Sequence, residues 1–239
     1  MTASPATAIL VHGSWHGPWC WDAVAALLGE RGVPVLAPAL PSMGDDPAAL
    51  GDMHADAAVI RAAIASVEGP VVVCGHSYGG FPVTEAAAGQ ANVRRVVYLC
   101  ALVPDAGETL FEQVGWVDDQ PVGPAAGLDL DEATGTHAID PAIARSALYH
   151  DVDDAVAEAC LARLVRQAAV TGTQAANGIA WREVPSTYVV CTDDRTISVT
   201  LQRLLAARME QVVEWPTSHS PMLSRPTLVA DLLAAACGA

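Results

Sequence analysis

Lysine is absent from this chain, and all 12 of its basic residues are arginines, against 27 acidic residues. The absence of lysine excludes Schiff-base catalysis and any mechanism in which a lysine acts as general base. The formal net charge of −15 argues against a nucleic-acid partner and against binding to an anionic membrane surface. The composition therefore argues against lysine-dependent catalysis and against polyanionic partners.

Targeting and metal-binding patterns are also missing. Residues 1–8 show no signal-peptide pattern, and every apolar run is far shorter than a membrane span. The six cysteines form no CxxC or CxxH pair, so we expect reduced thiols in the core rather than a zinc site; they are Cys20, Cys74, Cys100, Cys160, Cys191 and Cys237. We expect a cytoplasmic protein with no metal and no cofactor.

The 239 residues, 52% of them hydrophobic, suit one α/β domain with an insertion. Six short β-rich runs are mostly too apolar for half-exposed strands, which favours the centre of a parallel sheet: residues 8–11, 33–37, 71–74, 93–100, 187–191 and 211–215. Helical patterns separate them, at residues 21–28, 50–67, 81–88, 199–209 and 228–236. This alternation predicts a mostly parallel, doubly wound sheet with helices on both faces.

Residues 104–180 break the alternation. They contain acidic loops around Gly123 and Pro124, a predicted helix at 153–168 and no convincing strand. The segment has enough apolar side chains to pack, which favours a folded unit over a disordered linker. We predict a helical cap inserted over the carboxyl edge of the sheet, where ligands bind in such folds. The core then consists of residues 1–103 and 181–239.

The segment Gly75-His76-Ser77-Tyr78-Gly79 joins an apolar strand to a helix and matches the Gly-x-Ser-x-Gly nucleophile elbow of serine hydrolases. A serine on so sharp a turn projects its hydroxyl away from the backbone, and the glycines avoid clashes within the turn. The alternative interpretation is a tight turn in which Ser77 only caps the following helix. The choice depends on whether the partners of a serine nucleophile are present.

A general base is expected on a loop after the last strand, where His219 lies. Its orienting carboxylate should follow the preceding strand, which Asp193 and Asp194 do. We predict Asp194 as this acid and keep Asp193 as the alternative. A buried aspartate would accept a hydrogen bond from His219 and leave the other ring nitrogen free for Ser77.

An oxyanion hole needs two N–H groups that converge on the developing negative charge. One is expected from the backbone of Tyr78, directly after the nucleophile. The other is expected from the glycine turn after the first strand, with the Ser14 N–H as the best candidate. His12 and His16 flank this turn, and we expect them to shape the pocket.

With this order of residues, the chain resembles the α/β-hydrolase superfamily over essentially its whole length. More narrowly, it resembles the plant methylesterase and hydroxynitrile lyase group and its bacterial esterase relatives. The segments that carry the resemblance are 11–21 (VHGSWHGPWCW), 75–80 (GHSYGG), 188–197 (YVVCTDDRTI) and 218–226 (SHSPMLSRP). The resemblance implies a cofactor-free fold with a mostly helical cap and an apolar pocket, and it supports Asp194 as the catalytic acid.

The chain departs from the lyases of that group at two positions. Those enzymes have a lysine directly after the catalytic histidine, where this chain has Ser220, and a threonine in the first loop, where it has Gly13. Since no cation is available to hold a cyanide leaving group, the sequence favours an esterase over a lyase. A ligand-binding protein on a hydrolase scaffold is the other alternative.

We therefore expect Ser77, His219 and Asp194 to hydrolyse small, largely apolar carboxylic esters through an acyl-enzyme. The expected partner is a small-molecule ester, with no nucleic acid and no membrane; a homodimer is left open. The predicted substrate pocket includes one residue of the first loop and four of the cap, although the cap residues could equally form the cap's own core: His16, Phe111, Trp116, Leu148 and Tyr149.

Overall fold

The computed structural model describes residues 5–121 and 127–239, so the predicted loop around Gly123 and Pro124 lies outside the described residues. Its centre is a six-stranded parallel sheet in the order β10-β9-β5-β4-β1-β2. The strands are β1 (Thr7–Val11), β2 (Val35–Leu36), β4 (Val71–His76), β5 (Val93–Leu99), β9 (Ser186–Cys191) and β10 (Gln211–Trp215). All six predicted strands are confirmed, with β2 shorter than expected.

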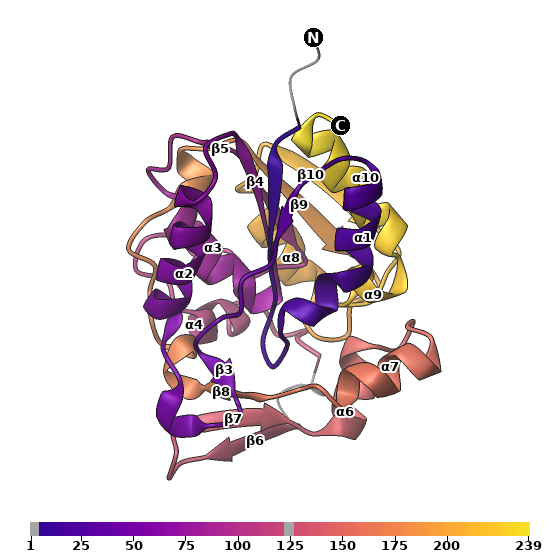
Figure 1. The fold of residues 1–239 in the computed structure, drawn as a ribbon. Coiled ribbons are helices and arrows are strands. Elements are labelled where there is room, and N and C mark those ends of the chain that lie inside the picture. Colours follow the sequence, from indigo (N-terminus) through magenta and orange to yellow (C-terminus); the bar gives the residue numbers. More distant parts are fainter. Residues whose placement is uncertain (1–4, 122–126) are drawn as a thin grey trace.

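Helices cover both faces of this sheet, as predicted (Figure 1). They are α1 (Asp22–Glu30), α2 (Met53–Ala65), α3 (Gly80–Ala87), α8 (Val199–Ala206), α9 (Pro221–Ser224) and α10 (Pro226–Cys237). Side chains alternate across each strand, so Ile9 and Val11 of β1 lie in the hydrophobic cluster that also contains side chains of α2, α3 and α8. Ala8 and Leu10 point to the opposite face and pack with α1 and α10. The inner strands β1, β4 and β9 are therefore buried on both sides and mostly apolar, whereas the edge strands β2 and β10 are more exposed.

The segment between β5 and β9 contains both helices and strands. Its helices are α4 (Leu110–Val114), α6 (Pro141–Leu148) and α7 (Asp154–Leu161), and its strands are β6 (Leu128–Asp131), β7 (Thr136–Ile139) and β8 (Arg166–Ala168). With β3 (Met43–Gly44), these strands form an antiparallel sheet in the order β3-β8-β7-β6. This sheet lies below the carboxyl ends of the central strands in Figure 1.

The prediction that this segment contains no strand is wrong, and the helix predicted at 153–168 ends at Leu161. Residues 166–168 are extended because they pair with β7 on one side and with β3, more than 120 residues earlier, on the other. A local signal for β6 and β7 was present: Leu128 and Leu130 alternate with aspartates, and a four-residue turn ending at Gly135 follows. That pattern is typical of a hairpin.

All six cysteines are buried and free, as predicted. Within residues 5–121 and 127–239, none of the helices has the length and apolar character needed to cross a bilayer.

The start of α3 is packed against the chain that follows β5. A Cβ atom added to Gly80 would lie 2.1 Å from the carbonyl oxygen of Leu102. Gly29 near the end of α1 has open space at the same position, with no atom within 4 Å. A methyl group would therefore clash with backbone at Gly80 but would fit without contact at Gly29.

We expect Gly80→Ala to lower the free energy of unfolding by about 2 kcal/mol or more, because the backbone must move to admit the methyl group. Gly29→Ala should raise it by up to about 1 kcal/mol through helix propensity. Urea denaturation of both variants measures this difference. Equal effects of the two substitutions would contradict the packing described for α3.

Candidate active site

Four loops at the carboxyl ends of parallel strands converge on one point. Ser77 directly follows β4, Asp194 follows β9, His219 follows β10, and the loop that contains Ser14 follows β1. Loops at this edge of a parallel sheet are where open α/β folds bind ligands. Residues far apart in the chain are thus brought together by the strand order.

Ser77 has a left-handed backbone conformation, with φ of +54°. The preceding strand residue, His76, is extended, and a helical turn starts at Ser77, so the hydroxyl lies at the corner. A Cβ atom on Gly79 would lie 2.6 Å from the carbonyl oxygen of His12, and one on Gly13 would lie 2.8 Å from the Cβ of Ser77. The two glycines therefore allow the first loop to pack directly against the elbow.

The structure brings Ser77, His219 and Asp194 into a continuous hydrogen-bonded array. The Ser77 Oγ lies 2.9 Å from Nε2 of His219, and Nδ1 of His219 lies 2.7 Å from Oδ2 of Asp194. Because the carboxylate can only accept, Nδ1 carries the proton and Nε2 is free to accept from Ser77. Both His219 and Asp194 are buried, whereas Asp193 is exposed.

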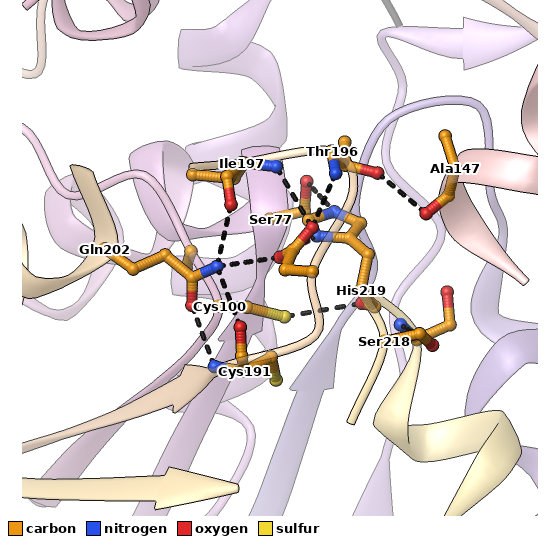
Figure 2. A network of polar contacts seen from close by, with 12 residues as sticks. Ser77, Cys100, Ala147, Cys191, Thr196, Ile197, Gln202, Ser218 and His219 are labelled. Atoms are coloured by element: carbon orange, nitrogen blue, oxygen red, sulfur yellow. Dashed lines mark hydrogen bonds and ion pairs between the residues drawn. The ribbon is translucent and has the colours of Figure 1, made fainter. Parts of the chain in front are cut away.

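Asp194 is held by hydrogen bonds to both carboxylate oxygens. Oδ1 accepts from the N–H groups of Thr196 and Ile197, at 2.7 and 3.0 Å, and Oδ2 also accepts from Gln202 Nε2 at 2.8 Å. Gln202, fully buried on α8, further bonds the backbone of Cys191 and Ile197 (Figure 2). Both oxygens of this buried carboxylate are thus satisfied by hydrogen-bond donors.

Gln202 is a functional residue that the sequence does not predict. A glutamine on an amphipathic helix gives no local signal of burial. Its role becomes visible only when α8 is placed beside the loop after β9.

Three buried histidines hold the loops around the array. His12 and His16 donate from Nδ1 to the carbonyl oxygens of Gly13 and Ser14, and His76 donates from Nε2 to that of His219. Burial lowers the pKa of His12 and of His16 to about 4 and that of His76 well below its usual value. All three imidazoles are therefore neutral at pH 7 and act as hydrogen-bond donors without adding charge beside His219.

The ligand atoms of His76, Cys100 and His219 lie within 4.8 Å of one another, which makes them the cluster to consider for a metal within the described residues. Both ring nitrogens of His219 are already hydrogen-bonded, to Ser77 and Asp194. His76 and the Cys100 thiol both donate to the His219 carbonyl, and burial raises the pKa of that thiol. The cluster is thus better suited to hold the His219 backbone than to bind a cation.

A cavity of about 310 Å³ opens in front of Ser77. Its walls are mostly apolar and come from the core loops and from the segment between β5 and β9: Ser14, Trp15, Ser77, Tyr78, Leu102, Leu110, Phe111, Val114, Gln120, Pro121, Leu128, Thr196 and Ile197. This volume is at the lower end of typical small-molecule sites.

Of the five predicted pocket residues, Phe111 lines this cavity. His16 lines a separate cavity with His12 and Trp19. Leu148 and Tyr149 are buried in a third hydrophobic cluster with Trp15. The Trp116 ring lies 5.3 Å from the Arg208 guanidinium carbon, at the surface. These four side chains are used to pack the loops rather than to line the cavity in front of Ser77.

A model of the alpha/beta hydrolase family matches residues 8–232, and the chain belongs to this family. A pyrethroid hydrolase of Sphingobium wenxiniae is 29% identical, over 95% of this chain and 85% of that protein. Methylesterase 9 of Arabidopsis thaliana is 24% identical, over 94% of this chain and 95% of its own length. The predicted resemblance to plant methylesterases and bacterial esterases is therefore confirmed.

The fold is shared with a solved structure of a pyrethroid hydrolase from Sphingobium faniae. The two chains superpose with a TM-score of 0.86 over 98% of each, at 24% sequence identity.

The lowered pKa values of His12 and His16 make the free energy of unfolding depend on pH. In the unfolded chain His12 and His16 take up protons near pH 6.5, but in the folded protein only near pH 4. Between these values the unfolded state binds more protons, so the free energy of unfolding falls as the pH drops from 6.5 towards 4. Each group contributes up to about 3 kcal/mol to this loss.

Urea denaturation at pH 7 and at pH 4.5 measures the effect, with His12→Gln as the variant. This substitution should destabilise the protein at pH 7, and its deficit relative to the wild-type protein should shrink at pH 4.5. A deficit of the same size at both pH values would contradict the buried, neutral state of His12.

Proposed function

We propose that this protein is a serine carboxylesterase that hydrolyses small, largely apolar carboxylic esters through an acyl-enzyme. The observation that carries the proposal is the array from Ser77 through His219 to Asp194, at the mouth of a mostly apolar cavity. Membership of the α/β-hydrolase family and the similarity to a methylesterase agree with ester hydrolysis.

In the first half-reaction, the Ser77 Oγ attacks the ester carbonyl carbon while Nε2 of His219 takes the hydroxyl proton. Asp194 stabilises the resulting imidazolium through the Nδ1–H hydrogen bond. The tetrahedral intermediate then collapses to an acyl-serine, and His219 gives the proton to the departing alcohol oxygen. In the second half-reaction, His219 takes a proton from water while the water oxygen adds to the acyl carbon. The bond from the acyl carbon to the Ser77 Oγ then breaks, and His219 returns the proton to that oxygen.

The N–H groups of Ser14 and Tyr78 are our candidates for the oxyanion hole. Both residues line the cavity in front of Ser77. Tyr78 lies in the first turn after the elbow, where backbone N–H groups have no acceptor within the helix. Each such donor is typically worth about 3 kcal/mol of transition-state stabilisation.

The cap is proposed to comprise residues 104–180, over a core of residues 1–103 and 181–239. Phe111, Val114 and Leu128 come from this segment and line the cavity, so the cap would supply the apolar side of the substrate site. The antiparallel sheet also includes β3, from residues 43–44, which ties the cap to the core chain. A cytoplasmic location and a homodimer stay predictions.

A hydroxynitrile-lyase-like reaction is a weaker alternative. A side chain at position 13 would collide with the Cβ of Ser77, which leaves no room for the threonine of the lyases. The residue after the base is Ser220, a buried hydroxyl that carries no charge.

The triad proposal is tested with p-nitrophenyl acetate and butanoate. Ser77→Ala should abolish turnover with unchanged circular dichroism. Asp194→Asn should lower kcat by about 10³ to 10⁴, because the amide no longer holds His219 in the required tautomer.

Asp193→Asn is the matched control, since it makes the same chemical change one residue away on an exposed side chain. It should keep kcat within about twofold of the wild-type value, as expected for a surface substitution. Full activity of Ser77→Ala, or equal losses in the two aspartate variants, would reject this triad.

A further inference from the structure

A second cavity, of about 450 Å³, adjoins the cavity in front of Ser77. It is lined almost entirely by apolar groups of the segment between β5 and β9: Phe111, Leu128, Leu130, His137, Ala169, Val170 and Thr173. Phe111 and Leu128 line both cavities, so these two side chains form the partition between them. We call the second space the distal cavity.

The position of Phe111 suggests that its side chain controls passage between the two cavities. Phe111 is 54% exposed, and Leu128, which also lines both cavities, is 40% exposed. The Phe111 ring rests against the backbone at Gly172, where an added Cβ would come within 2.4 Å of its Cζ. The ring is thus in contact with the backbone at Gly172, and more than half of the Phe111 surface is accessible to solvent.

None of the described residues that line the distal cavity carries a charged side chain. His137 is its most polar lining group, and its Nδ1 accepts a hydrogen bond from Nε1 of Trp15, which lines the cavity in front of Ser77. Burial lowers the pKa of His137 to about 4, so the ring is neutral at pH 7. A neutral, apolar space of this size suits an alkyl chain or a second ring.

We propose that the distal cavity binds the apolar tail of an elongated ester whose carbonyl is held at Ser77, with Phe111 and Leu128 setting the accepted tail length. This inference rests on the proposed esterase function. The shared wall favours the substrate itself as the occupant, because a tail that passes Phe111 enters the distal cavity directly. Each methylene transferred there from water favours binding by up to about fourfold.

The first test removes the partition. Phe111→Ala should raise the ratio of kcat/KM for p-nitrophenyl decanoate over butanoate at least tenfold. The same comparison is made with decyl and butyl acetate, because the tail can belong to the acyl or the alcohol side. Val114→Ala, on the same helix but lining only the cavity in front of Ser77, should change these ratios less than threefold.

The second test places a charge in the distal cavity. Val170→Asp should lower kcat/KM for decanoate at least tenfold more than for butanoate in the Phe111→Ala background. Val156→Asp is the matched control, since Val156 on α7 is similarly exposed, 41% against 47%, and lines neither cavity. It should leave the ratio unchanged.

The inference is overturned if Ser77-dependent ester hydrolysis persists and neither Phe111→Ala nor Val170→Asp changes the length ratios in either ester series. An absence of Ser77-dependent hydrolysis in the wild-type protein would instead reject the proposed function. Thermal denaturation of each variant shows whether a change in the ratio of kcat/KM between long and short esters is due to unfolding of the variant.

Discussion

The left-handed backbone of Ser77 is the constraint on which the site depends. A non-glycine residue in this conformation typically costs about 1–3 kcal/mol, so the surrounding structure must hold it there. The Leu102 N–H donates to the Ser77 carbonyl at 3.1 Å, and the loop after β1 packs against the turn through Gly13. The other two non-glycine residues with positive φ in the described chain, Trp15 and Cys100, lie in the loops next to it.

The second requirement is that His219 has a single orientation. Its ring is fixed by Ser77 and Asp194, and its carbonyl oxygen accepts from both His76 and Cys100. The groups that hold the His219 backbone are thus titratable, but both the His76 imidazole and the Cys100 thiol are neutral. Charge is concentrated on Asp194, where backbone and glutamine donors satisfy it. In this arrangement the described imidazole that is hydrogen-bonded to Ser77 is that of His219.

Much of the core could be predicted from the sequence because its signals are local. Ser77 and Asp194 follow buried, mostly apolar strands and His219 follows the edge strand β10, so the parallel sheet brings the three residues to one edge. The segment between β5 and β9 could not be predicted in this way. Its strand β8 is extended because it pairs with β7 on one side and with Met43 and Gly44, far away in the chain, on the other. The sequence leaves Leu148 and Tyr149 equally suited to a pocket and to a core, and in the structure they pack in a hydrophobic cluster with Trp15.

The central claim is that His219 activates Ser77. Labelling with a fluorophosphonate, followed by peptide mass spectrometry, tests it without any assumption about the natural substrate. We expect rapid modification of Ser77 alone in the wild-type protein, and a rate at least 10³-fold lower in a folded His219→Ala variant, since the serine then has no base to take its proton. Equal labelling rates in the two proteins, or modification at another serine, would contradict this account.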